Sequence, residues 1–231
     1  MNRRRFLTVL SATWYLSDFL LASDIPQEPF LINSGIGGNT SADLIKRIDK
    51  DCLAYQPDLT ILMVGTNDMN SMKYIPIAQY EKNMRLIISK ILDSGSRIIL
   101  MNLLPVYEPY LFTRHKKEFY EPEGHSGRKL EMNNLLKKLA IECNLSFLDI
   151  DHIFEKVGNV GEERNSLIQN EANSGKKDGL HPTSDGYRII AIALYQYIMQ
   201  NNLPHNRVVC FGDSITAGSY PNYLKKLLNI T

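Results

Sequence analysis

The sequence predicts an α/β domain whose parallel sheet is covered by helices on both faces. Short apolar runs alternate along the chain with segments whose apolar residues recur at the spacing of a helix face. Parallel strands need crossover connections, which helices usually supply, so this alternation favours a parallel sheet. With 231 residues, 44% of them hydrophobic and 22% charged, the chain has ample material for one buried core.

Five predicted strands alternate with predicted helices. The strands cover residues 30–33, 59–64, 97–103, 145–150 and 208–211. The helices cover residues 41–53, 77–92, 127–143, 184–199 and 221–228, with Thr40 or Ser41 as the N-cap of the first. Residues 153–177 are polar and punctuated by glycine, so we expect a mobile excursion there.

Residues 105–126 interrupt the pattern between a strand and a helix. An insertion of this length and aromatic content, at the carboxyl ends of the strands, is a candidate lid or substrate wall. The alternative is a surface loop that packs its own aromatic side chains together. The five aromatic residues on which both interpretations depend are Tyr107, Tyr110, Phe112, Phe119 and Tyr120.

The loops after the strands carry the candidate functional residues. Functional groups collect where the carboxyl ends of parallel strands meet. Gly38 follows the first strand, Asn67 the second and Ser214 the last. A serine in a tight turn between strand and helix lies beside backbone N–H groups, which suits a nucleophile whose attack creates an oxyanion. The alternative is an ordinary Gly-Asp-Ser turn with no chemistry.

A histidine with a carboxylate three residues before it stands in Asp178-Gly179-Leu180-His181. The carboxylate can accept a hydrogen bond from the ring Nδ1–H, which leaves Nε2 free to take a proton from a serine hydroxyl. The alternative is an Asp and a His that decorate a helix N-terminus. No two histidines or cysteines have zinc-ligand spacing. The remaining histidines lie in polar or linker contexts and are weaker candidates: His115, His125, His152 and His205.

Asn67 has a use of its own in this chemistry. A side-chain amide at the end of a strand can donate to a developing oxyanion, as can the backbone N–H groups of Gly38 and Ser214. The alternative is an asparagine that only caps a turn.

Four blocks of this sequence together resemble a known family. They are Gly-Gly-Asn-Thr at 37–40, Gly-Thr-Asn-Asp at 65–68, Asp-Gly-Leu-His-Pro at 178–182 and Gly-Asp-Ser-Ile-Thr-Ala-Gly at 212–218. The set is similar to the blocks of the SGNH (GDSL-type) serine hydrolases. The resemblance implies Ser214 as nucleophile, His181 as general base and acid, and Asp178 as the residue that orients His181. It implies an oxyanion hole of Gly38, Asn67 and Ser214, and no metal or organic cofactor.

The resemblance also implies a fold: a flavodoxin-like three-layer α/β/α sandwich around a five-stranded parallel sheet. One departure is large, because the Gly-Asp-Ser block comes first in the family and last here. The sequence therefore looks like a circular permutant. Permutation is tolerated where the termini lie close together at the surface.

The predicted function is a serine esterase that hydrolyses carboxylic esters through an acyl-enzyme on Ser214. The substrate is then a small-molecule ester, and for an exported enzyme an acetylated sugar is the preferred choice. Alternatives are an acyl hydrolase of the lysophospholipase or thioesterase type and a non-catalytic ligand-binding relative. Nucleotide binding by the glycines at 35–38 is disfavoured because no Lys-Ser/Thr pair follows them.

The first 23 residues are predicted to be a signal or N-terminal anchor, followed by a single domain at 24–231. Arg3-Arg4 before Phe6-Leu7 resembles a twin-arginine signal, which predicts export to the periplasm or beyond, although Asp18 is costly in such a segment. The alternative is a retained amphipathic helix in a cytoplasmic protein, and membrane contact is expected only in that retained form. The net charge of +1 gives no field that recruits nucleic acid.

Overall fold

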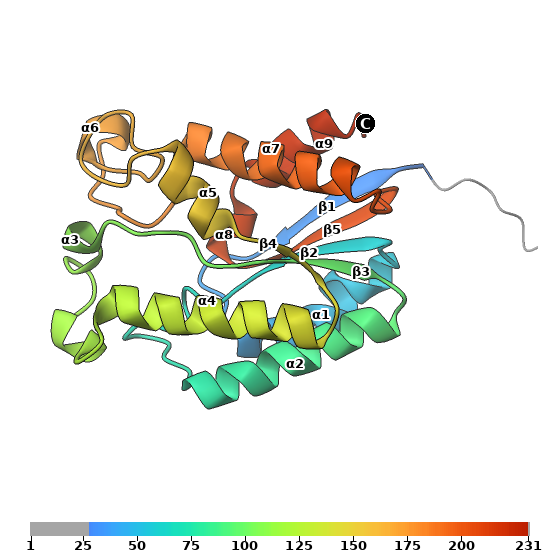
Figure 1. Ribbon diagram of the computed structural model, residues 1–231, viewed down its shortest axis with the longest axis horizontal. Coiled ribbons are helices and arrows are strands. Elements are labelled where there is room, and N and C mark those ends of the chain that lie inside the picture. The colour runs from blue at the N-terminus through green and yellow to red at the C-terminus, as the bar shows by residue number, and fades with distance from the viewer. Residues whose placement is uncertain (1–27, 231) are drawn as a thin grey trace, which may run out of the picture.

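The computed structural model describes residues 28–230, which fold around one five-stranded parallel sheet (Figure 1). In chain order the strands are β1 (Phe30–Gly35), β2 (Leu59–Met63), β3 (Arg97–Met101), β4 (Ser146–Leu148) and β5 (Arg207–Gly212). Their order across the sheet is β1-β5-β2-β3-β4, and every neighbouring pair is parallel. The last strand of the chain thus lies between the first two.

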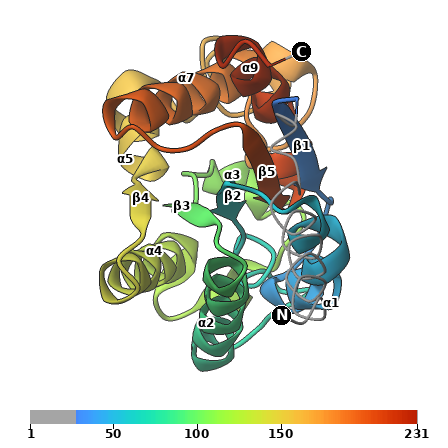
Figure 2. The same ribbon diagram turned by 90° about the vertical axis from the view of Figure 1, so that its right-hand side faces the viewer.

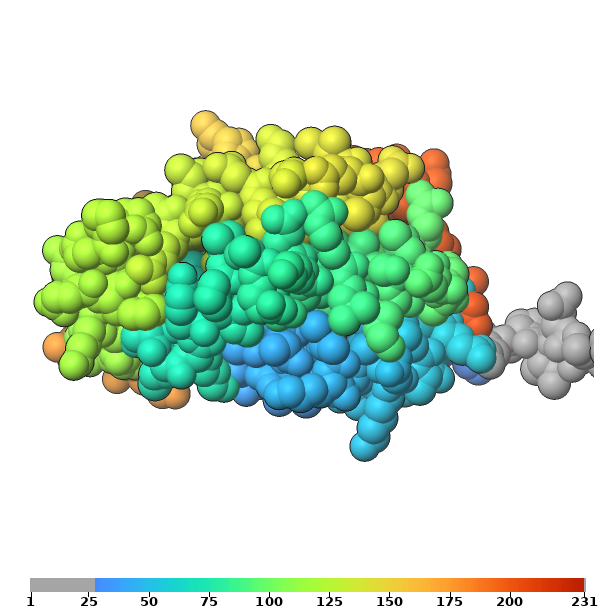
Figure 3. Space-filling model, turned by 90° about the horizontal axis from the view of Figure 1, so that it is seen from below, coloured from blue at the N-terminus to red at the C-terminus, as the bar shows by residue number. Residues whose placement is uncertain are grey.

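Helices form a layer on each face of this sheet, as Figure 2 shows. One layer holds α1 (Ser41–Asp51), α2 (Ile77–Asp93) and α4 (Gly124–Glu142), which lie side by side on the surface seen in Figure 3. The other holds α5 (Ile150–Val157), α7 (Ser184–Gln200) and α9 (Tyr220–Leu227). Shorter pieces are α3 (Glu108–Leu111), α6 (Glu171–Ser174), α8 (Ser214–Ala217) and the 3-10 turns η1 (Leu53–Tyr55) and η2 (Lys117–Tyr120).

Two hydrophobic cores lie on either side of the sheet. Successive side chains of a strand point to opposite faces, so each inner strand supplies both cores. In β2, Ile61 packs into the core beneath α5, α7 and α9, while Leu62 packs into the core beneath α1, α2 and α4. All five residues of β2 are buried, as expected for a strand covered on both faces. The predicted three-layer sandwich with a five-stranded parallel sheet is confirmed.

Two strands end earlier than predicted, because side chains replace their ladder bonds. The predicted strand 97–103 ends at Met101, since the N–H of Leu103 donates to Oδ1 of Asn133 at 2.9 Å. Asn102 donates from Nδ2 to Oδ1 of Asp149 at 2.7 Å. The predicted strand 145–150 ends at Leu148, because Asp149 caps α5 by accepting from the backbone N–H of His152.

The segment 153–177, for which the sequence predicts a mobile excursion, contains regular and hydrogen-bonded structure. It contains the end of α5 and the short helix α6, where Asn170 and Asn173 form a capping box. Asn170 also donates from Nδ2 to the carbonyls of Gly161 and Glu163, at 2.7 and 2.8 Å. Asparagine hydrogen bonds therefore hold this segment together, in addition to the buried side chains of Leu167 and Ile168.

The predicted signal or anchor segment, residues 1–23, lies outside the described residues. Within residues 28–230, no helix combines the length and the apolar character that crossing a bilayer requires.

Candidate active site

The turn after β5 presents Ser214 at the carboxyl edge of the sheet. Asp213 caps α8, because its Oδ1 accepts from the backbone N–H of Ile215 at 3.0 Å, so Ser214 is the first residue of that helix. Gly212 permits the turn. A Cβ at this position would lie 2.2 Å from the carbonyl oxygen of Met63 and 2.3 Å from Oγ1 of Thr216.

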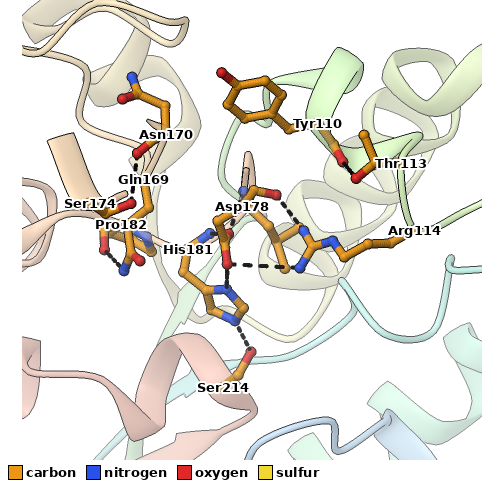
Figure 4. Close-up of polar contacts among 11 residues, drawn as sticks. Tyr110, Thr113, Arg114, Gln169, Asn170, Ser174, Asp178, His181, Pro182 and Ser214 are labelled. Atoms are coloured by element: carbon orange, nitrogen blue, oxygen red, sulfur yellow. Dashed lines mark hydrogen bonds and ion pairs between the residues drawn. The ribbon is translucent and has the colours of Figure 1, made fainter. Parts of the chain in front are cut away.

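Ser214, His181 and Asp178 form a continuous hydrogen-bonded relay (Figure 4). Nε2 of His181 lies 3.0 Å from Oγ of Ser214, and Nδ1 lies 3.0 and 3.1 Å from the two carboxyl oxygens of Asp178. Oδ1 of Asp178 also accepts from the backbone N–H groups of Leu180, at 2.9 Å, and of His181, at 2.7 Å. The structure thus brings Ser214, His181 and Asp178 together, as the sequence predicted.

The charge on Asp178 determines which ring nitrogen of His181 can act as a base. Burial opposes ionisation of this carboxyl, but hydrogen bonds from the His181 ring and backbone, and from the Leu180 N–H, together hold the pKa of Asp178 well below its usual range. An ionised Asp178 accepts from Nδ1–H, which leaves the lone pair of a neutral ring on Nε2. That lone pair faces the hydroxyl of Ser214.

The loops that carry Gly38 and Asn67 are fixed to each other. Thr40 caps α1, and Asp68 accepts from the backbone N–H of Ser41 at 2.9 and 3.1 Å. Nδ2 of Asn67 donates to the carbonyl of Asn39 at 3.0 Å. These bonds join the end of β2 to the loop before α1.

Further contacts orient the groups that can bind an oxyanion. Nδ2 of Asn70 lies 3.3 Å from Oδ1 of Asn67, which fixes the Asn67 amide so that the second Nδ2 hydrogen is available. Arg47 donates to Oδ1 of Asn39 and to the carbonyls of Ser34 and Gly212, at 2.7, 2.9 and 2.8 Å. It thereby ties the Gly38 loop to the Ser214 turn.

A pocket of about 230 Å³ opens at these groups. Four of the predicted site residues line it, while Asp178 stands behind His181. The remaining walls come from the β2–α2 loop, the 105–126 insertion and the start of α4. Its lining residues are Gly38, Thr66, Asn67, Asn70, Met72, Leu111, Arg114, His115, Tyr120, His125, Leu180, His181 and Ser214.

Both interpretations of the 105–126 insertion describe part of it. Its aromatic rings pack on one another, with centroids 5.0 Å apart for Tyr107 and Tyr110 and 5.2 Å apart for Phe119 and Tyr120. The same segment supplies Leu111, Arg114, His115 and Tyr120 to the pocket. It is a wall of the pocket built around its own small aromatic cluster.

His115 and His125 also line the pocket. The polar or linker context predicted for them is wrong, whereas their rank below His181 as the candidate base agrees with the contact of His181 with Ser214. His115 and His125 are 8% and 2% exposed, and Nδ1 of His115 lies 3.0 Å from Oγ of Ser71. Burial lowers the pKa of His115 and lowers that of His125 to about 4, which favours the neutral form of both rings. Neither is hydrogen-bonded to Ser214 or His181. The signal that could have found them is the aromatic insertion that flanks them.

A Ser-His-Asp relay at the carboxyl edge of a parallel sheet, with N–H donors beside the serine, defines a serine hydrolase of the α/β class. The model of the GDSL-like Lipase/Acylhydrolase family matches residues 12–189, and the chain belongs to this family. The predicted family resemblance and the predicted action on ester bonds are therefore confirmed. The match ends before the Gly-Asp-Ser block at 212–218.

Two curated relatives cover about seventy per cent of this chain. The chain is 27% identical over 175 residues to YqeF, an uncharacterised lipoprotein of Bacillus subtilis, covering 69% of this chain and 70% of the relative. It is 26% identical over 176 residues to an acetylxylan esterase of Geobacillus stearothermophilus, covering 73% of this chain and 71% of the relative.

Solved structures share the fold at lower identity. A lipase/acylhydrolase from Enterococcus faecalis superposes with a TM-score of 0.56 at 19% identity, covering 74% of this chain and 75% of that one. A GDSL-like lipase from Bacteroides thetaiotaomicron gives a TM-score of 0.56 at 21% identity, covering 72% and 74%. At these identities the likeness concerns the fold alone.

Proposed function

We propose that this acylhydrolase is a serine esterase that acts through an acyl-enzyme on Ser214. The observation that carries the proposal is the relay itself, with Nε2 of His181 3.0 Å from Oγ of Ser214 and Nδ1 held by Asp178. Oγ attacks the ester carbonyl while its proton passes to Nε2. The protonated His181 then gives that proton to the departing alcohol oxygen, and the acyl group remains on Ser214.

Deacylation repeats these steps with water. His181 removes a proton from a water molecule, the hydroxide attacks the acyl-enzyme, and Ser214 leaves with the proton returned by His181. Both tetrahedral intermediates carry a negative oxygen. The donors we assign to it are the backbone N–H groups of Gly38 and Ser214 and the second Nδ2 hydrogen of Asn67. Each such donor contributes on the order of 3 kcal/mol to the stability of the transition state.

The substrate we propose is an O-acetylated carbohydrate. The pocket of about 230 Å³ is small, and its walls mix aromatic Tyr120 with polar side chains such as Asn70 and His115. Such a lining suits a hydroxylated ring with a short acyl group better than a long alkyl chain, which needs a continuous apolar channel. The relative named as an acetylxylan esterase agrees with this choice.

A comparison of substrates tests the acyl preference. Nitrophenyl esters from acetate to decanoate, acetylated xylo-oligosaccharides, a lysophospholipid and an acyl thioester are assayed with the same protein. We expect kcat/KM to fall steeply beyond the shortest acyl chains and acetylated sugars to be deacetylated. A preference for decanoate, for the lysophospholipid or for the thioester would replace the sugar proposal by an acyl hydrolase of that type.

Labelling with a small fluorophosphonate tests the nucleophile directly. We expect one adduct on Ser214 in the intact protein, read by mass, and none in the Ser214→Ala and His181→Ala variants. Absence of labelling in a well-folded wild-type protein, together with no turnover of any ester, would favour the non-catalytic ligand-binding alternative.

We also propose that residues 1–23 direct export. The support is the arginine pair before an apolar segment, together with a relative that is named a lipoprotein. Fractionation of cells that express the full chain tests this, with Arg3→Lys and Arg4→Lys combined as the matched variant. We expect the wild type outside the cytoplasm, without the N-terminal segment, and the double variant retained inside. Wild-type protein that is found uncleaved in the cytoplasm would contradict export.

We propose, finally, that the chain is a circular permutant of the usual family order. If the strands are counted from β5, the order β1-β5-β2-β3-β4 becomes 2-1-3-4-5, which is the flavodoxin-like order. The C-terminal helix α9 contacts β1, so the two ends of the fold lie close together (Figures 1 and 2). A variant that starts at residue 204 and joins residue 231 to residue 28 by a short linker should fold and keep esterase activity. Failure of that variant to fold would count against permutation.

A further inference from the structure

The 105–126 insertion is attached to the loop that carries Asp178, the acidic residue of the Ser-His-Asp relay. The backbone N–H of Tyr107 donates to the carbonyl of Gly179 at 2.7 Å. Nη2 of Arg114 donates to the carbonyl of Asp178, and Nη1 of Arg114 lies 3.8 Å from Oδ2 of the same residue. Figure 4 shows Asp178 between the His181 ring and the Arg114 guanidinium. The carboxylate therefore has a basic side chain on each side.

Gly179 makes this attachment possible. Its φ is +73°, a value that side chains disfavour, and a Cβ would lie 2.6 Å from the carbonyl oxygen of Tyr107 and 2.8 Å from Cβ of Tyr110. The start of α3 thus rests directly on the peptide next to Asp178. A side chain at position 179 would push the insertion away from the catalytic loop.

Arg114 affects geometry more than stability. Its side chain is 39% exposed, and that of Asp178 is 14% exposed, so solvent screens the ion pair and its contribution to folding is small. The two contacts nevertheless reach both the carbonyl and the carboxylate of one residue, which restricts how Asp178 can turn. Small displacements of a catalytic group can cost up to about a hundredfold in rate.

We propose that Arg114 is a positioning residue of the hydrolase: it holds Asp178 in the orientation that supports His181, and it makes the insertion part of the catalytic apparatus. The inference rests on the proposed esterase function. Arg114 also lines the pocket, so a role in binding substrate is the competing explanation. The two roles differ in kinetics. A positioning residue changes kcat, whereas a residue that binds ground state and transition state equally changes KM.

Steady-state kinetics with nitrophenyl acetate compare Arg114→Ala and Arg114→Lys with the wild type. We expect Arg114→Ala to lower kcat at least tenfold with KM within a factor of two, and Arg114→Lys to recover only part of the loss because an ammonium lacks the planar fork. Guanidinium chloride, added well below denaturing concentrations, should raise the rate of Arg114→Ala but not that of Ser214→Ala. Arg85→Ala is the matched control, because Arg85 is an exposed arginine that pairs with Glu81 and Glu142.

Proton NMR supplies a readout that does not depend on turnover. The Nδ1–H of His181, bonded to a carboxylate, gives a low-field resonance that His181→Ala identifies by its loss. We expect this resonance in the wild type and in Arg85→Ala, and a shifted or exchange-broadened one in Arg114→Ala at an unchanged melting temperature.

The outcomes separate the two proposals. An unchanged kcat and an unchanged resonance in Arg114→Ala would overturn the positioning role, and a raised KM alone would assign Arg114 to substrate binding instead. A wild type that hydrolyses no ester, yet shows the resonance and its dependence on Arg114, would overturn the esterase function while keeping the positioning role.

Discussion

Asp213 offers a sharp test of how the fold tolerates a buried carboxyl beside Ser214. The residue is 1% exposed. Burial, reinforced by the nearby charge of Asp68, raises the pKa of Asp213 to about 7. In the unfolded chain the same group titrates near 3.8, the ordinary pKa of an aspartate. Between these two pH values the folded protein binds a proton that the unfolded chain has lost.

The sign of the pH dependence follows from this difference. Because the folded state holds the extra proton, the stability contributed by Asp213 is complete below about pH 4 and is lost as the pH rises through about 7. About two pH units of the interval between the unfolded and folded pKa values lie between pH 5 and pH 8. The free energy of unfolding of the wild type therefore falls by about 3 kcal/mol over that pH range. Asp68, whose pKa burial raises to about 6, acts in the same direction.

The substitution Asp213→Asn isolates the effect, because the amide oxygen can still accept from the Ile215 N–H while no charge is buried. Urea unfolding at pH 5, 6, 7 and 8 gives the free energy of unfolding for each protein. We expect the stability of Asp213→Asn relative to the wild type to rise by about 3 kcal/mol from pH 5 to pH 8.

The control is Asp43→Asn. The hydrogen bond from Lys46 is the largest cause that lowers the pKa of Asp43, to about 2, so the stability it contributes is lost only as the pH falls below about 4. It should leave the slope between pH 5 and 8 unchanged. Parallel pH profiles for Asp213→Asn and the wild type would refute the reasoning, since they would mean that Asp213 is ionised in the folded state at no cost.

Three further predictions follow from the geometry. Asn67→Ala should lower kcat by about a hundredfold to a thousandfold, with little change in melting temperature, because it removes one oxyanion donor; a loss below threefold in esterase assays would remove Asn67 from that role. Gly212→Ala should destabilise the fold by several kcal/mol in urea titrations, since the new Cβ would lie 2.2 Å from the Met63 carbonyl oxygen, and a wild-type midpoint would show that the turn can relax. Deletion of residues 207–231 should abolish cooperative unfolding followed by circular dichroism, because β5 hydrogen-bonds to both β1 and β2; a folded but inactive product would contradict this.

Local patterns were enough to predict the sheet and the residues at its edge. The strands are short runs of apolar residues, and Gly38, Asn67 and Ser214 each follow one of them, so the parallel topology alone brings them together. Asp178 and His181 lie only three residues apart, so one short segment contains both residues that complete the relay with Ser214. Such features depend on residues that are close together in the sequence, so they can be predicted from the sequence alone.

What the sequence did not reveal depends on contacts between distant segments. The strand end at Met101 is set by Asn133 and Asp149, which lie about 30 and 47 residues further along the chain. Arg114 is 64 residues from Asp178, and its place in the site is decided by how the insertion folds over Gly179. An arginine in an aromatic loop gives no sign of this. Local sequence patterns do not predict the contacts of polar side chains whose partners lie far away in the sequence.

The position of β5 has a consequence for the order of events in the cell. Translation proceeds toward the C-terminus, so β1 and β2 emerge long before β5, the strand that joins them. Among the described strands, β1 pairs only with β5. Ser214 follows that same strand by two residues. A nascent chain therefore cannot close its sheet, or complete the proposed active site, until residues 207–214 have been translated. A product that ends before Arg207 lacks both Ser214 and the strand that lies between β1 and β2.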